Sequence, residues 1–220
     1  MAKKTKIAWI LAEDKAGMLN QALGLGEAVQ RKLIEKNVNL ELDVRPISVP
    51  GFKKYLPNQL WLSGLAGIKD LSGKGFQRPW PDMVISAARK AARPASEIKK
   101  KALRDGKDVF AIHIQRPGID MNNFDIVTCP VHDQMRGDNL IETIGSPGRV
   151  SKDKLEVAAR DFAEKFEVYR RPLIAVSIGG RSKVYDFGIS ELKALADNLR
   201  ILAKKSDGSL LITASRRSPP

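Results

Sequence analysis

Apolar runs and amphipathic stretches alternate along the first part of the chain. Residues 6–12 form a nearly unbroken apolar run of strand length, which predicts a strand covered on both faces. Residues 18–36 carry apolar side chains at helical spacing, and residues 38–45 alternate apolar with polar positions. This order predicts a strand, a helix and a second strand lying parallel to the first.

The same kind of pattern continues to about residue 166. Apolar strands are predicted at residues 83–87, 108–114, 124–128 and 140–144, separated by helix-like or loop segments. Strands joined in this way predict an open α/β sheet with right-handed crossovers. A helix is predicted at residues 151–166, with Ser151 as its N-cap, and we expect it to close this domain.

The pattern restarts after Pro172. A strand is predicted at residues 173–178, a helix at 189–203 and a strand at 209–213. One β-α-β unit of roughly 45 residues buries too little surface to stand alone. The sequence therefore predicts a first α/β domain at residues 1–168 and the incomplete start of a second at residues 169–220.

The chain is strongly basic, with 38 Lys and Arg against 25 Asp and Glu and a formal net charge of +13. Such a field attracts phosphates, nucleic acids or anionic lipid. Residues 86–107 hold eight basic and two acidic residues, and residues 50–81 hold five basic and one acidic residue among several aromatics. Nucleic acid is the least favoured partner, because no RRM, KH, zinc-finger or helix-turn-helix signature occurs.

Aromatic and basic residues together in the 50–81 segment are typical of a membrane-interface patch. The patch is expected to comprise Phe52, Lys53, Lys54, Trp61 and Trp80. The competing interpretation is a loop and helix packed on the edge of the sheet with a solvated basic face. An anionic membrane surface is the first partner to test.

Cysteine and histidine usage limits the chemistry. The single cysteine, Cys129, forbids an intramolecular disulfide, and with only His113 and His132 there is no Cys/His cluster for zinc. The basic N-terminus leads into an apolar run too short for a secretory signal, and no stretch is apolar enough to span a bilayer. We therefore expect a cytoplasmic protein that needs no metal and touches a membrane only peripherally.

Polar residues follow most of the predicted strands, and the carboxyl ends of parallel strands are where α/β sheets bind ligands. Glycines there let a backbone approach a phosphate, and arginines bind it in a bidentate manner. The candidates for ligand and phosphate binding are Gly17, Asn20, Gln21, Ser86, Arg89, Gln115, Gly179, Gly180, Ser215, Arg216 and Arg217.

Simpler interpretations of several residues remain open. Gly24 and Gly26 favour close helix-to-sheet packing, and Gly179 and Gly180 could form no more than a sharp turn. Arg216 and Arg217 could belong to a solvated chain end. His132, beside Asp133, is a candidate acid/base. His113 is expected to be a hydrogen-bonded core residue, and Cys129 is expected to be buried.

Five motifs in order carry a family resemblance. They are KAGMLNQALGL at 15–25, IQRP at 114–117, FDIVTCPVHD at 124–133, IGG at 178–180 and TASRRSP at 213–219. Together they resemble the mitochondrial-fission "elongated mitochondria" family and its bacterial relatives. The plant member is regarded as a fission factor that recruits a dynamin-like protein to a membrane, and bacterial members are often described as related to nucleoside-diphosphate sugars. Ala88 stands where relatives often have a glycine before Arg89.

The resemblance implies a GT-B glycosyltransferase-like fold, with two Rossmann-like domains and a cleft between them. By that analogy Gly17, Asn20 and Gln21 would face the acceptor, and the insertion around Trp61 would touch the membrane. Gly179 and Gly180, with Ser215, Arg216 and Arg217, would begin the nucleotide-sugar half.

Two functions from different classes follow. The first is a GT-B-like protein, peripheral to the cytoplasmic face of the inner membrane, that binds a nucleotide-sugar or diphosphate and transfers a sugar to a lipid-linked acceptor without a cofactor. The second is a non-enzymatic membrane adaptor of the fission type that binds anionic lipid and a protein partner. An inactive truncated remnant is the third outcome.

Overall fold

The computed structural model describes residues 4–57, 60–61, 64–180, 186–215 and 218. Arg216 and Arg217 lie outside these residues, as do the side chains of Phe52 and Lys54. The chain divides into two compact units, residues 1–150 and 151–220. The domain boundary at residue 168 that the sequence pattern favoured stays a prediction.

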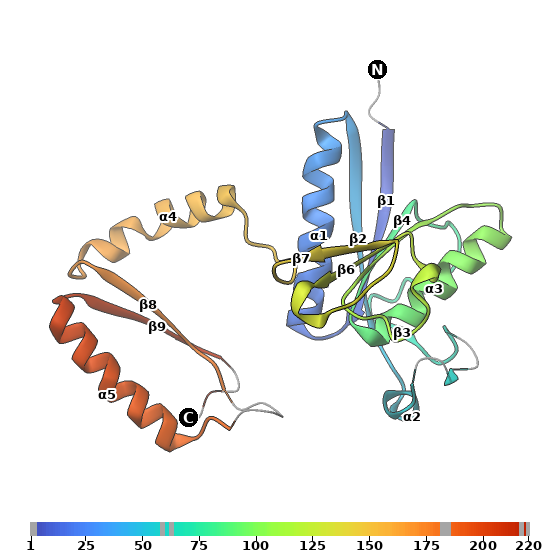
Figure 1. Cartoon of the computed structure of the whole chain (residues 1–220). Coiled ribbons are helices and arrows are strands. Elements are labelled where there is room, and N and C mark those ends of the chain that lie inside the picture. The colour runs from blue at the N-terminus through green and yellow to red at the C-terminus, as the bar shows by residue number, and fades with distance from the viewer. Residues whose placement is uncertain (1–3, 58–59, 62–63, 181–185, 216–217, 219–220) are drawn as a thin grey trace. The chain divides into compact units, whose positions relative to one another are not determined.

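Unit 1 is built on a seven-stranded sheet (Figure 1). Its strands are β1 (Lys4–Glu13), β2 (Val38–Ser48), β3 (Lys69–Asp70), β4 (Met83–Ala87), β5 (Phe110–Ile114), β6 (Ile126–Pro130) and β7 (Leu140–Thr143). The spatial order is β3-β2-β1-β4-β5-β6-β7, and every neighbouring pair is parallel except β2 with β3. The α/β fold is Rossmann-like, as expected.

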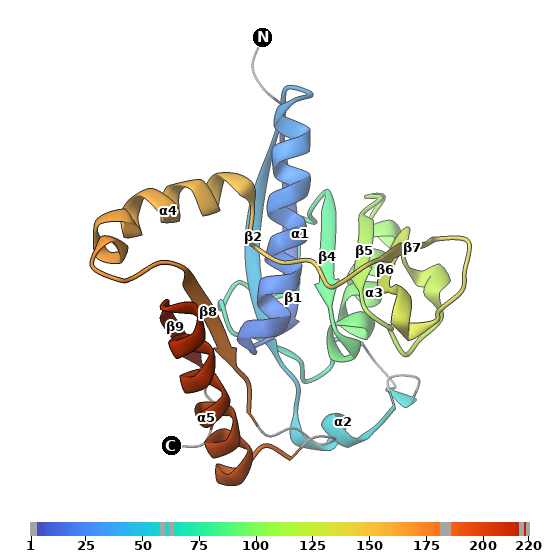
Figure 2. The same ribbon diagram turned by 60° about the vertical axis from the view of Figure 1, so that its left-hand side comes forward.

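Helices cover both faces of this sheet (Figure 2). Helix α1 (Ala16–Ile34) packs against β1, β2 and β4 over a core that includes Ile10, Leu40 and Ile85. Helix α3 (Arg89–Arg104) packs over the opposite core, which includes Trp9 and Val84. A short helix, α2 (Gly51–Tyr55), lies between β2 and β3.

Six of the seven strands and helix α1 are confirmed within a few residues of their predicted bounds. Strand β3 was not predicted, because two residues give no periodicity. The sequence pattern does not predict helix α3 specifically. Its many lysines and arginines surround a narrow buried face made mostly of alanine, and Pro94 lies inside the helix. Small side chains bring this helix close to the sheet.

Two of the three glycines inside α1, Gly24 and Gly26, are explained by close packing. A Cβ atom at Gly26 would lie 3.0 Å from Cδ1 of Ile10, so the predicted approach of the helix to the sheet is confirmed there. A Cβ atom at Gly24 would overlap the backbone of Gly148, which belongs to the segment after β7 and not to the sheet. The loss of helix propensity at both positions is offset by these contacts.

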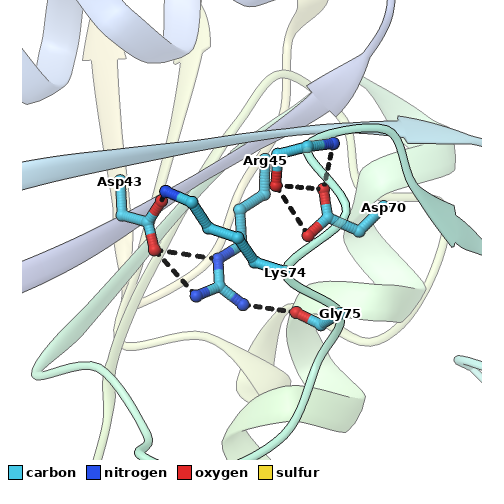
Figure 3. Close-up of polar contacts among 6 residues, drawn as sticks. Asp43, Arg45, Asp70, Lys74 and Gly75 are labelled. Carbon is cyan, nitrogen blue, oxygen red and sulfur yellow. Dashed lines mark hydrogen bonds and ion pairs between the residues drawn. The ribbon is translucent and has the colours of Figure 1, made fainter.

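A buried arginine joins the segment around β3 to the sheet (Figure 3). The Arg45 guanidinium lies 3.4 Å from the centroid of the Trp9 ring and donates to Asp43 Oδ2 from Nε (3.0 Å) and Nη2 (2.7 Å). It also donates to the carbonyl of Gly75, and Lys74 donates to the other oxygen of Asp43. Burial would raise the pKa of Asp43, but these hydrogen bonds outweigh it and lower the pKa.

Unit 2 contains α4 (Lys152–Glu167), β8 (Leu173–Ile178), α5 (Ile189–Ser206) and β9 (Ser209–Ala214). Strands β8 and β9 pair in parallel, which confirms the restart of the α/β pattern after Pro172. The predicted cap of α4 is confirmed, because Ser151 Oγ accepts from the Lys154 amide at 3.4 Å. Among the described residues of this unit, none is buried.

Among the described residues, no helix is both long enough and apolar enough to span a membrane.

Candidate functional site

The strand order of unit 1 reverses between β1 and β4. From β1 the chain crosses over to β2 on one side, while β4 leads to β5, β6 and β7 on the other. Helix α1 starts directly after β1 over one face, and α3 starts directly after β4 over the other. Crevices at such a reversal, beyond the carboxyl ends of the strands, are where open α/β sheets bind their ligands.

Both helix starts at this crevice suit an anion. Neither α1 nor α3 has a side chain that caps its first amides, and neither has an acidic residue in its first turn. Helices α4 and α5 of unit 2 do carry an acid there, Asp153 and Glu191 respectively. The first N–H groups of α1 and α3, at the positive ends of their dipoles, therefore have no acidic residue in their own first turns, and the carboxylate beside them, Glu13, is paired with Lys15 and Lys90.

Two predicted site residues meet at the carboxyl ends of the strands. Gln115, directly after β5, donates from Nε2 to Oε1 of Gln21 in α1 at 2.9 Å, although 94 residues separate them. The Gln115 backbone has φ +75, and its backbone N–H donates to the Thr128 carbonyl at 2.7 Å. Gly17 and Asn20 are exposed in the first turns of the same helix α1. The structure thus brings four of the predicted residues to this rim.

Basic side chains flank the two helix starts. Lys15, before α1, and Lys90, in the first turn of α3, each contact Glu13 at 3.2 Å. Burial alone would raise the pKa of Glu13, but the hydrogen bonds from the two lysines outweigh it, and the pKa is lowered. Arg89 is exposed as the first residue of α3. Glu13 holds the two lysines beside the α1 and α3 termini.

The prediction that Ser86 contacts a ligand is corrected. Ser86 is fully buried, and its hydroxyl lies 2.8 Å from Nδ1 of His113 on the neighbouring strand. The hydroxyl supports a core imidazole and is out of reach of solvent. His113 itself is the hydrogen-bonded core residue that was expected, and burial lowers its pKa to about 3.

His132 lies in a 3-10 turn, η3 (Val131–Asp133), directly after β6. Its side chain is exposed, with Nε2 3.8 Å from Oδ1 of Asp133. The other oxygen of Asp133 accepts from the Cys129 thiol at 3.1 Å, and burial together with this carboxylate raises the pKa of Cys129 to about 11. Cys129 is thus the buried, protonated residue that was expected, and an acid/base role for His132 stays a prediction.

The predicted membrane patch is corrected at two residues. Trp61 is 2 % exposed and Lys53 is 6 % exposed, so neither reaches a lipid surface while the segment keeps this packing. Trp80 is half-buried and donates from Nε1 to Asp105 at 2.6 Å. Among the described residues of this segment, the large apolar side chains that face solvent are Tyr55, Leu56, Leu60 and Leu71. Composition located the segment, but only packing decided which of its side chains stay outside.

In unit 2 the structure brings together two of the predicted motifs. The amide of Ser215, after β9, donates to the Ile178 carbonyl at 3.0 Å. The hydroxyl of Ser218 donates to the carbonyl of Gly179 at 2.8 Å, and Gly180 follows directly in sequence. Ser218 was not predicted as a site residue, although Ser-x-x-Ser spacing is a signal for such a closed turn.

Ala88 is the N-cap residue of α3 and has φ 65 and ψ 155, a region that only glycine adopts without strain. We expect Ala88→Gly to raise the free energy of unfolding of unit 1 by about 1 kcal/mol, because relief of strain outweighs the added entropy of the unfolded chain. Urea denaturation measures the effect. Ala16→Gly, at the start of α1, is the matched control and should destabilise; a similar loss at Ala88 would contradict the strain.

Comparison with known proteins places the chain in a family. The family model described as "Mitochondrial fission ELM1" matches residues 16–220. The mitochondrial fission protein ELM1 of Arabidopsis thaliana is 28% identical over 177 residues, which cover 70% of this chain and 40% of that protein. The uncharacterised protein RP120 of Rickettsia prowazekii (strain Madrid E) is 29% identical over 126 residues, which cover 57% of this chain and 32% of that protein. The chain therefore spans well under half the length of these relatives, and no solved structure matches it. On the family match, which covers nearly all of its residues, the chain belongs to the mitochondrial fission ELM1 family.

Proposed function

We propose that unit 1 binds a diphosphate-bearing ligand, of the nucleotide-sugar or lipid-linked class, in the crevice between the starts of α1 and α3. The chain would act as part of a longer GT-B-like protein, peripheral to the cytoplasmic face of a membrane, that transfers a sugar to a lipid-linked acceptor. The match covers 40% of the Arabidopsis relative. The transfer activity is therefore proposed for a protein of the relative's length and not for this chain alone.

One observation carries the binding proposal. Two helices begin at the reversal of strand order, on opposite faces of the sheet, and both lack a side-chain cap and an acidic first turn. The amide N–H groups at the two helix termini could donate hydrogen bonds to the two phosphates of a diphosphate. Arg89, Lys15 and Lys90 would add positive charge beside them.

The glutamine pair suggests how a sugar would be recognised. Each amide of Gln21 and Gln115 retains hydrogen-bonding groups beyond the one bond that joins them, and sugar hydroxyls can both donate and accept. A departing diphosphate would be stabilised by helix termini and basic side chains, which is chemistry that needs no metal. The residues Gly179, Gly180 and Ser215 of unit 2, with Arg216 and Arg217, stay predicted phosphate-binding residues of that unit.

Calorimetric titration of the full chain with UDP-sugars and with inorganic pyrophosphate tests this proposal. We expect binding that weakens with added salt, and about fivefold weaker binding of the UDP-sugar by Gln21→Ala or Gln115→Ala, since each loses a hydrogen bond of about 1 kcal/mol. Gln77→Ala, at an exposed position outside the crevice, is the matched control. Equal binding by all three variants, or no heat with either ligand, would contradict the site.

The adaptor function is favoured by a different observation, the exposed apolar group of Tyr55, Leu56 and Leu60. Tyr55 is 89 % exposed, which is typical of a side chain that enters an interface. Co-sedimentation with anionic vesicles, together with no heat from any UDP-sugar, would select the adaptor over the transferase.

A further inference from the structure

The segment between α2 and β3 packs tightly on α3. The residues of this contact are different from those of the crevice. Gly64 marks the contact, because a Cβ atom there would lie 2.8 Å from the Arg93 carbonyl oxygen and 2.8 Å from Cβ of Glu97. Trp61 is buried in the same core as α3 residues Ala92 and Ala95. Polar groups trapped under this segment therefore need partners inside the protein or from a ligand.

Two cations lie close together under it. Lys53 is 6 % exposed, with Nζ 4.9 Å from the centroid of the Trp61 ring, and it donates to the Ala66 carbonyl at 2.7 Å. Arg93 reaches the backbone of the same tryptophan, with Nη2 3.4 Å from the Trp61 carbonyl oxygen. Burial first, and then the charge of Arg93, lowers the pKa of Lys53. Two basic side chains thus lie at Trp61, one over its ring and one at its carbonyl oxygen.

Two hydrogen-bond donors beside these cations are buried and unused. Nε1 of Trp61 and Nε of Arg93 are shielded from solvent and have no hydrogen-bond partner among the described residues. A buried donor without an acceptor destabilises the fold, because it has lost its hydrogen bonds to water. Glu97, one turn further along α3, forms no ion pair with Arg93 in the part of the chain that is described.

We infer that Lys53, Trp61 and Arg93 form a binding site for a phosphate oxyanion, separate from the crevice between α1 and α3. An oxyanion could accept from the indole N–H and from Nε of Arg93, both of which are strong donors to a charged acceptor. The planar guanidinium favours phosphate, and the Lys53 ammonium adds a nearby second charge. One ligand would satisfy both unused donors and offset the repulsion between the two cations.

The phosphate could come from a small phosphorylated molecule or from a lipid headgroup. The lipid source is considered because Tyr55, Leu56 and Leu60, the exposed apolar residues, belong to the same segment as Lys53 and Trp61. A lipid whose headgroup entered the site would bring its acyl chains toward these residues. The recognition chemistry is the same in both cases, so the experiment has one arm for each source.

The first arm is equilibrium dialysis of the full chain with radiolabelled inorganic phosphate. We expect about tenfold weaker binding by Trp61→Phe, which keeps an aromatic ring and removes the indole N–H, and by Arg93→Lys, which keeps the charge and removes the guanidinium fork. Lys101→Gln, exposed on the same helix, is the control and should bind as the unchanged chain does. Circular dichroism verifies that both site variants are folded.

The second arm is co-sedimentation with phosphatidylcholine vesicles that contain phosphatidic acid, compared with phosphatidylcholine alone. Loss of phosphate binding in both site variants supports a small-molecule ligand, and loss of vesicle binding in both supports a lipid headgroup. Wild-type affinity of the folded variants for both probes, or no binding of either probe by the unchanged chain, overturns the site. Gln21→Ala and Gln115→Ala should leave both readouts unchanged, which separates this test from that of the crevice.

Discussion

Arg45→Ala is expected to lower the free energy of unfolding of unit 1 by about 3–5 kcal/mol. Arg45 is 7 % exposed and has Asp43, the Gly75 carbonyl and the Trp9 ring as partners at once. Alanine leaves the carboxylate of Asp43, itself only 18% exposed, with Lys74 as its remaining cation. It also releases the segment after β3 from the edge of the sheet.

Urea denaturation followed by tryptophan fluorescence measures this loss, because all three tryptophans, Trp9, Trp61 and Trp80, lie in unit 1. Arg31→Ala, at an exposed position of α1, is the control and should change stability by no more than about 0.5 kcal/mol. Combining Arg45→Ala with Asp43→Ala should cost less than the sum of the two single changes, since they share one interaction. An Arg45→Ala loss below about 1 kcal/mol would show that the cluster does not hold the segment.

Unit 1 is also expected to lose about 2 kcal/mol of stability between pH 7.5 and pH 5 because of His113 alone. Burial lowers the pKa of this imidazole to about 3 in the folded chain, against about 6.5 when it is unfolded. Below pH 6.5 the unfolded chain therefore binds a proton that the folded chain does not. Stability falls as the pH falls, by about 1.4 kcal/mol per pH unit, until the folded imidazole also titrates near pH 3.

Urea midpoints across this pH range test the prediction. The chain has only two histidines, so His132→Gln, at the exposed one, is a direct control and should keep the full slope. His113→Gln should be less stable at pH 7.5, because its contact with Ser86 is altered, yet nearly independent of pH down to pH 5. The carboxyls with lowered pKa values, Glu13, Asp43, Asp82 and Asp105, contribute mainly below this range. An unchanged slope in His113→Gln would refute the assignment.

The outcome for the crevice shows how far a pattern along the chain can locate a site. Gln21 and Gln115 were both placed at the carboxyl ends of strands, and that rule alone predicted that two residues so far apart in sequence would be close. Ser86 followed the same rule and failed. Because side chains alternate along a strand, its side chain lies on the face under α3. There it is buried and forms a hydrogen bond with His113 of the next strand.

The membrane segment failed for a different reason. Lysine and tryptophan at residues 53 and 61 have the composition of an interfacial patch, and composition does not report which side chains a neighbouring helix covers. Gly64 permits the close approach of this segment to α3, and that contact buries Trp61 with Lys53 beside it. The described large apolar residues of this segment that stay exposed include Tyr55, Leu56 and Leu60.

The order of residues by itself determined the α/β class, six of the seven strands of unit 1, the restart after Pro172 and the family, because periodicity and motif spacing are local properties of a chain. Tertiary structure decided what those elements enclose: Arg45 under the segment after β3, His113 against Ser86, and two unused donors beside Lys53. Burial and charge pairing depend on which distant elements pack together, and the free energy of a polar group depends on that packing far more than on its neighbours in sequence.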